Sequence, residues 1–184
     1  MPNDKLRPEG CGARRLEESQ LTMVVALKFL HILIAVWFIA GLVGRGVILR
    51  FASREQNVER IGGLLEASGF FERFMVIPGW SAVLAAGMLL GWLAGYPLLG
   101  SLVGHGPNWV LAAIVIWLST LPWVPLVFLP RAKRFSAALE ESRRIGSVTP
   151  ALTTAFGDRL VRVGHVYEYV AVIVLVYFMV AKPF

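Results

Sequence analysis

Residues 23–44 are MVVALKFLHILIAVWFIAGLVG, an apolar run in which only Lys28 and His31 carry ionisable side chains. A helix over these residues rises about 33 Å, which is enough to cross the ~30 Å hydrocarbon core of a bilayer. Residues 74–92, 109–129 and 163–180 are similarly apolar, and 57% of the chain is hydrophobic. The sequence therefore predicts an all-α, polytopic membrane four-helix bundle over residues 23–184.

The polar segments outside these spans predict a topology. Residues 1–22 interleave acidic and basic side chains and are expected to form a mobile tail. The apolar run after them is too long for a cleaved signal peptide, so we expect the first span to be retained. Lys and Arg concentrate between the first and second spans and between the third and fourth, whereas residues 93–108 contain none. This distribution predicts a bacterial cytoplasmic (inner) membrane protein with both termini outside, and the net charge of +6 does not indicate nucleic-acid binding.

The two basic loops carry helical patterns of their own. In the first loop, Val58, Ile61 and Leu65 have helical spacing, and Ala132, Phe135 and Leu139 have it in the third. Both patterns predict short amphipathic cytoplasmic helices lying on the headgroups, although each also fits a solvated connector with some helical character.

His31 is the first candidate site residue. A charged side chain at the centre of a span costs roughly 2.5 to 3.5 kcal/mol, so ionisable residues within spans are functional candidates by default. Two interpretations stay open: His31 packs as a neutral side chain bonded one turn away, or it binds a ligand or a proton.

The second span carries features that favour close packing and bending. Gly87, Gly91 and Gly95 recur every four residues and leave one helix face nearly bare, which suits packing within the bundle or between two copies. Prolines remove backbone donors, so Pro78 in this span and the pair Pro122 and Pro125 in the third predict kinks around a hollow.

Depth arguments sort the remaining polar residues. His165 and Glu168 are three positions apart on one face of the fourth span, at a depth where Arg45 of the first span could reach Glu168. We expect an Arg45–Glu168 ion pair, because pairing avoids burying either charge alone. His31 and His165 differ in depth by about 13 Å, too far for both to bind one iron. Cys11 is the only cysteine, which excludes an internal disulfide.

A family resemblance adds a candidate role for His31. The string Leu27–His31, followed by Ala35–Trp37 and Ala40–Leu42, resembles a bacterial family of predicted integral membrane proteins of unknown function. Glu72–Gly79 and the ending Met179–Phe184 match the same family. The first-span pattern is also similar to the membrane haem-containing protoporphyrinogen oxidase family and, more distantly, to the copper-resistance D-type membrane family.

What the oxidase resemblance implies is a haem b ligand at His31. That family also has a functional lysine at the start of its third span, where this chain has Asn108, Trp109 and Val110. The resemblance therefore implies the haem site, and the missing lysine removes its support for the oxidase activity.

Two functional hypotheses follow for this membrane protein. In the first, His31 binds haem b, or another metal centre such as copper, for redox or tetrapyrrole handling. In the second, the chain is a non-catalytic accessory subunit of a larger membrane complex of respiratory or photosynthetic type, packed through its glycine face, and not an independent enzyme. A small transporter using Glu168 is a third reading, disfavoured because no repeated half is evident.

Overall fold

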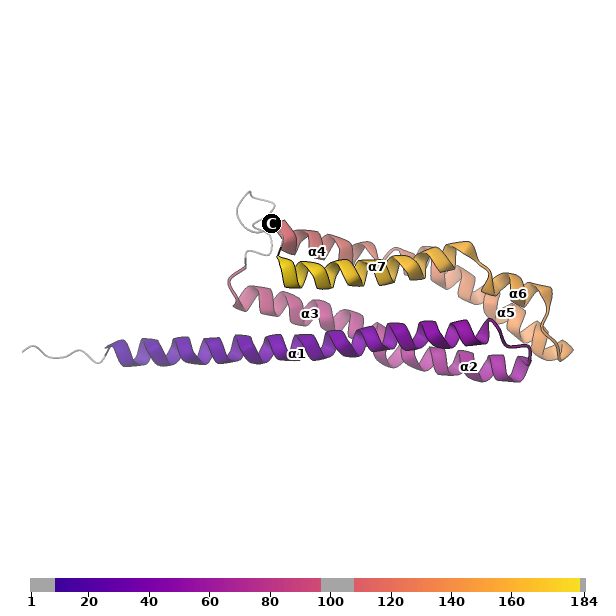
Figure 1. Cartoon of the computed structure of the whole chain (residues 1–184), viewed down its shortest axis with the longest axis horizontal. Helices are drawn as coiled ribbons and strands as arrows, with labels where there is room; N and C mark the ends of the chain where they lie inside the picture. Colours follow the sequence, from indigo (N-terminus) through magenta and orange to yellow (C-terminus); the bar gives the residue numbers. More distant parts are fainter. Residues whose placement is uncertain (1–8, 97–107, 183–184) are drawn as a thin grey trace, which may run out of the picture.

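The computed structural model describes residues 9–96 and 108–182 (Figure 1), and these residues form helices joined by turns, without any strand. The elements are α1 (Glu9–Ala52), α2 (Val58–Phe71), the π-helix η1 (Glu72–Val76), α3 (Ile77–Leu93), α4 (Asn108–Ser119), the π-helix η3 (Val124–Phe128), α5 (Leu129–Ile145), α6 (Pro150–Phe156) and α7 (Arg159–Ala181).

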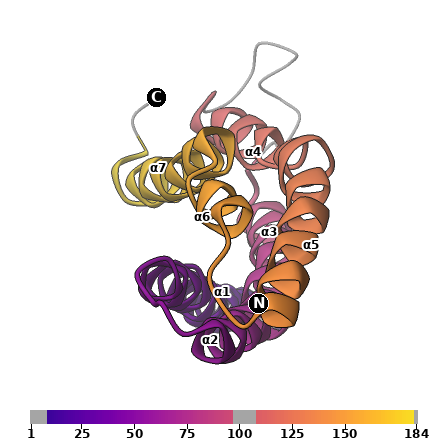
Figure 2. The ribbon, with the colours of Figure 1, turned by 90° about the vertical axis from the view of Figure 1, so that its right-hand side faces the viewer.

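Four stretches of helix are long and apolar enough to cross a membrane. They are Glu18–Ala52, Val58–Leu93, Trp109–Ile145 and Pro150–Ala181. Seen from its end in Figure 2, the bundle places α1 and α2 side by side, with α3 and α5 along one flank and α4 and α7 opposite α1. The all-α, four-span architecture predicted from hydropathy is confirmed.

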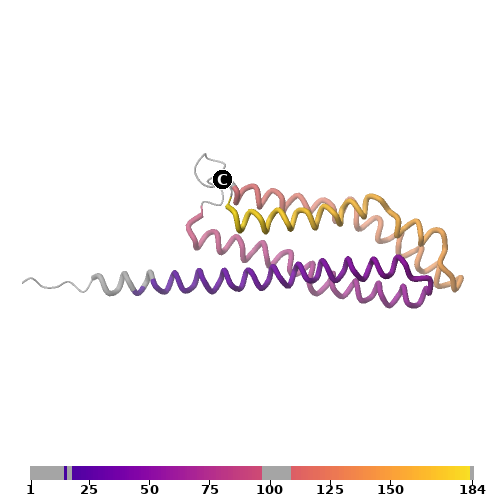
Figure 3. Tube along the Cα trace, in the orientation of Figure 1, coloured from indigo at the N-terminus to yellow at the C-terminus, as the bar shows by residue number. Residues whose placement is uncertain are grey.

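The helices are longer than the apolar runs from which they were predicted. The helix α1 begins at Glu9, inside the segment expected to be a mobile tail, and its N-terminal part runs past the ends of α3 and α7 (Figure 3). Hydropathy detects only the portion of a helix suited to lipid, whereas the helical backbone continues wherever the side chains allow it.

The two amphipathic loop segments are helical. Figure 1 shows α2 continuing in line with α3, whereas Figure 2 shows α5 running obliquely across the end of the bundle, from the α4 side toward α2. The buried residues of α2 include Val58 and Ile61, and α2 packs along α1 and against α5. Protein therefore covers the buried residues of α2, and the prediction that both loop segments are helical is confirmed.

Each π-helix precedes a proline by the same interval. Pro78 follows η1 after one residue, and Pro130 follows η3 after one residue. A proline clashes with the carbonyl four residues earlier, and a wider turn relieves that clash. The turn is indeed wider: Ile77 N–H donates to Glu72 O, and Leu129 N–H donates to Val124 O, both across five residues.

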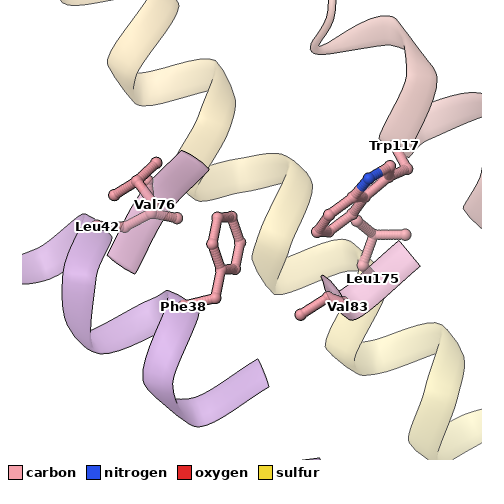
Figure 4. Close-up of a cluster of buried hydrophobic side chains, with 6 residues drawn as sticks. All are labelled: Phe38, Leu42, Val76, Val83, Trp117 and Leu175. Carbon is pink, nitrogen blue, oxygen red and sulfur yellow. The ribbon is translucent and has the colours of Figure 1, made fainter. Parts of the chain in front are cut away.

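The apolar core joins five elements (Figure 4). Its buried side chains are Phe38, Leu42, Val76, Val83, Trp117 and Leu175. The Trp117 ring stacks on that of Trp80, with centroids 5.4 Å apart, and Trp80 Nε1 donates to Thr120 Oγ1 at 3.1 Å. Aromatic packing therefore connects the α1–α3 side of the bundle to α4.

Glycines allow α1 to approach η1 and α3 closely. A Cβ added at Gly41 would lie 2.5 Å from Met75 Cβ, and one at Gly79 would lie 2.9 Å from Phe38 Cβ. At Gly44 the added atom would lie 2.6 Å from the Phe71 ring. The close helix contact that small residues provide in membranes thus centres on these three positions.

Candidate functional sites

His31 lies on the face of α1 that meets α3. The residue is 6% exposed, and a Cβ at Gly87 would lie 3.1 Å from its Cε1. Its Nδ1 atom is fully covered and has no hydrogen-bond partner within the described residues. Lys28, one turn earlier, is exposed. The ring therefore fills the space that a side chain at position 87 would take.

The predicted glycine face of α3 divides at its end. Gly87 meets His31, whereas Gly95 lies beyond the last residue of α3, Leu93, and has a φ of 74°. A Cβ built at Gly95 finds nothing within 4 Å. Assigning Gly95 to helix packing was therefore wrong: its left-handed backbone turns the chain after α3, and glycine adopts that conformation without steric cost. Gly91 is half-buried in the last turn of α3.

A second site lies nearer the α1–α2 loop and is built around Arg45. Nη1 of Arg45 donates to Glu72 Oε2 at 2.6 Å, and Nη2 donates to Glu168 Oε2. The same Nη2 atom lies 3.1 Å from His165 Nδ1, which is also 3.1 Å from Glu168 Oε2. We call these four residues the Arg45 cluster. The contact that depth predicted, Arg45 with Glu168, is one of three that this guanidinium makes.

Three elements deliver the side chains of the Arg45 cluster, and a fourth packs a ring against it. Arg45 comes from α1, Glu72 is the first residue of η1, and His165 and Glu168 share one face of α7. Phe128, the last residue of η3, stacks on the His165 ring with centroids 4.9 Å apart and 20° between the planes. Both π-helices thus supply a side chain at the cluster, and π turns often occur at functional sites.

Two glycines let the helices close around the cluster. The Tyr169 hydroxyl donates to Leu42 O at 2.9 Å and occupies the space beside Gly46, where a Cβ would collide with it. On the other side, a Cβ at Gly164 would lie 2.9 Å from Phe128 Cζ. Any side chain at either glycine would push α7 away from α1 or from η3.

The Arg45 cluster is buried but not closed. The Arg45 side chain is 7% exposed, those of Glu168 and His165 are 17% and 26% exposed, and that of Glu72 is 40% exposed. Two carboxylates face one guanidinium, so the cluster carries one net negative charge when His165 is neutral. Arg45 Nε is covered and lacks a partner in the described part of the chain. The arrangement can hold one further positive charge.

His31 and the Arg45 cluster are separate sites. Fourteen residues of α1 separate His31 from Arg45, which corresponds to about 21 Å along the helix axis. His165 contacts Arg45, Glu168 and Phe128, so within the described chain it belongs to the second site. Among residues 9–96 and 108–182, no group of three or more His, Cys, Asp or Glu side chains could hold a metal ion.

A polar hollow lies at the loop end of the molecule, away from both sites. It has a volume of about 430 Å³ and is lined by Glu55, Gln56, Asn57, Val58, Glu59, Arg143 and Gly146. The backbone N–H groups of Asn57 and Gln56 donate to Glu55 and lower the pKa of its carboxyl. This loop carboxylate therefore stays charged and orders the turn into α2.

Sequence reasoning missed Glu72 and Phe128 as site residues. Glu72 precedes the predicted second span, and Phe128 is one apolar residue among many in the third. A proline was the available signal in both cases. Pro78 and Pro130 each follow a wide turn, and Glu72 is the first residue of one turn while Phe128 is the last residue of the other. The side chain of Cys11 and the whole of His105 lie outside what the structure describes.

Comparison with known proteins finds one family. A family model described as a predicted integral membrane protein (DUF2269) matches residues 25–183, which is most of the chain. No curated protein and no solved structure matches the sequence.

Proposed function

The chain belongs to the DUF2269 family of predicted integral membrane proteins, and on that premise we propose that it binds haem b through His31 and serves redox or tetrapyrrole handling. The observation that carries this proposal is the buried His31 ring, whose Nδ1 has no partner in the described chain. A buried polar atom without a hydrogen bond costs roughly 1–3 kcal/mol, so this ring is not held in place by the hydrogen bond that a purely structural histidine would make.

The surroundings of His31 suit a single protein ligand. Gly87 leaves the ring room against α3, and Nδ1 is covered, so Nε2 is the nitrogen left for an iron atom. His165 is held in the Arg45 cluster, about 21 Å further along the bundle, so no second histidine from the described chain completes the site. Haem bound there would supply one-electron redox chemistry. The protein contributes a fixed imidazole and an apolar wall that excludes water.

The proposal includes an orientation. We place the protein in a bacterial cytoplasmic membrane with both termini outside, so that the basic α2 and α5 segments face the cytoplasm. Arg54, Arg60, Lys133, Arg134 and Arg143 are among the basic residues on that side. The positive-inside rule supports this direction. His31 then lies in the outer half of the membrane and the Arg45 cluster in the inner half.

An absorption spectrum tests the haem proposal. Protein purified in mild detergent from a haem-replete host should show a Soret band, and His31→Ala should abolish it. Gly87→Ala should weaken or shift the band, because the new methyl group would lie 3.1 Å from His31 Cε1. Gly63→Ala is the matched control, since nothing lies within 4 Å of its Cβ position. A missing band, or one unchanged by His31→Ala, would falsify the proposal.

A second candidate function is that of an accessory subunit in a larger membrane complex. The supporting observation is the N-terminal part of α1, which runs beyond the neighbouring helices and exposes Leu21, Met23, Val25 and Phe29 (Figure 3). This candidate predicts co-purification with a larger assembly after mild solubilisation. Isolation of the whole chain as a stable monomer from its native membrane would rule it out.

A further inference from the structure

We propose that the Arg45 cluster is a proton-binding site, in which His165 takes the proton on Nδ1 and thereby exchanges Arg45 for Glu168 as its hydrogen-bond partner. The step involves no redox change and no bond other than N–H: a proton leaves water and binds the lone pair of Nδ1. This proposal is independent of haem binding at His31, which concerns another part of α1.

The position of His165 Nδ1 allows two hydrogen-bond partners, of which it can engage only one at a time. The atom lies 3.1 Å from Arg45 Nη2, which only donates, and 3.1 Å from Glu168 Oε2, which only accepts when ionised. Without a proton, Nδ1 accepts from Arg45 and its lone pair faces the carboxylate. With a proton, Nδ1 donates to Glu168 and its N–H faces the guanidinium. Each state satisfies one contact and leaves the other unfavourable, so neither is fixed by geometry alone.

The charges of the Arg45 cluster favour taking up a proton. Arg45 is bonded to both Glu72 and Glu168, so one positive charge is shared by two carboxylates. A proton on His165 makes the four residues neutral together, and an uncompensated charge is costly in a buried site. Among the contacts that the structure records, the other group on His165 is the uncharged Phe128 ring. On the same helix the Tyr169 hydroxyl donates to Leu42 O, and Arg162, three residues before His165, is exposed.

The proton also has a way in. The Glu72 side chain is 40% exposed while that of Arg45 is 7% exposed, so the cluster reaches its surroundings mainly through Glu72. Glu72 is the first residue of η1, and its backbone carbonyl accepts the five-residue hydrogen bond from Ile77 N–H. A carboxylate at the edge of a buried charge cluster is suited to relay protons, because it accepts them from water and faces the guanidinium that holds the site together.

Nitrogen-15 NMR of the histidines in the whole chain in lipid nanodiscs tests the proposal. The chain has three histidines, and the His165 signals are assigned by their loss in His165→Gln. Spectra recorded from about pH 8 to about pH 5 are compared for the imidazolium form of His165, whose appearance the proposal requires. In the neutral form the proposal places the proton on Nε2, so that Nδ1 accepts from Arg45. A neutral His165 protonated on Nδ1, or a protonation state constant over this range, overturns the proposal.

Charge-removing variants provide the second measurement. At a pH where wild-type His165 is partly charged, Glu168→Gln should remove the imidazolium signal, since Arg45 and Glu72 then balance each other. Arg45→Gln should increase that signal, because both carboxylates remain. Glu141→Gln is the matched control: its partner Arg144 is exposed and far from the cluster in sequence, and the spectrum should not change. Equal spectra in Glu168→Gln and wild type would also overturn the proposal, and the wild-type tautomer decides it if the variants fail to fold.

Discussion

Replacing Arg45 with methionine should destabilise the protein more than any other single charge removal in the described bundle. The side chain is 7% exposed and bonds two carboxylates, so Arg45→Met leaves Glu168 buried without its cation. Breaking a buried pair by removing one partner costs about 3–5 kcal/mol. We expect a loss toward the lower end of that range, because the Glu72 side chain, at 40% exposed, is less buried than that of Glu168 and loses less when its cation is removed.

Reversible unfolding in mixed micelles measures this loss. The chain has six tryptophans, including Trp80 and Trp117 in the core, so their fluorescence reports on the packing between helices. The double variant Arg45→Met/Glu168→Met should recover most of the stability, since apolar residues that replace both partners of a buried pair are often tolerated. The difference between the stability change of the double variant and the sum of the changes in the two single variants gives the interaction energy of the pair.

An exposed ion pair supplies the control and the refutation. Arg144 pairs with Glu141 at 2.8 Å, with side chains 75% and 45% exposed. Arg144→Met should leave the unfolding midpoint unchanged, because water screens such pairs. If Arg45→Met loses no more stability than Arg144→Met, the Arg45 cluster does not hold the bundle together and our reasoning from burial is wrong.

Two further predictions concern helix packing. Gly41→Ala should cost about 1–3 kcal/mol in the same assay, because the new Cβ would lie 2.5 Å from Met75 Cβ on η1, whereas Gly63→Ala should cost nothing; equal stability of the two variants would contradict the close approach. A double-mutant cycle of Trp80→Phe and Thr120→Val should give a coupling of about 0.6 kcal/mol for their 3.1 Å hydrogen bond, and strict additivity would show that the bond contributes nothing.

Hydropathy was sufficient to predict the four spans because lipid demands long apolar helices. It could not predict where those helices begin and end. The helix α1 extends from Glu9 to Ala52, and α2 continues into α3 through η1, since polar residues interrupt an apolar run without interrupting backbone hydrogen bonds. The amphipathic pattern of α2 was recognised correctly, but a pattern does not say whether lipid or protein covers its apolar face.

The candidate sites were predictable in part for a related reason. Depth along antiparallel spans predicted the contact between Arg45 and Glu168, because residue number converts directly to height in a membrane helix. Height carries no information on rotation about the helix axis. Glu72 and Phe128 therefore went unnoticed, since a wide turn changes which face of a helix they occupy. Gly41 and Gly44 were not predicted as packing positions, because they are three residues apart and lack the regular four-residue spacing of the glycines in the second span.

The two prolines explain how a charged site and an apolar core coexist on the same helices. One residue of an α-helix turns the chain by about 100°, so a π turn rotates all residues before it by roughly that angle relative to those after it. In the α2–η1–α3 helix, Val83 after the turn packs in the core while Glu72 at its start meets Arg45. If the chain before Pro78 formed a regular α-helix, either the core packing of Val83 or the contact of Glu72 with Arg45 would be lost. The apolar contacts would persist because they are the more numerous, and Glu72 would turn away from Arg45. Pro130 likewise follows a wide turn, but there the side chain at the cluster comes from the last residue of the turn, Phe128, which stacks on His165.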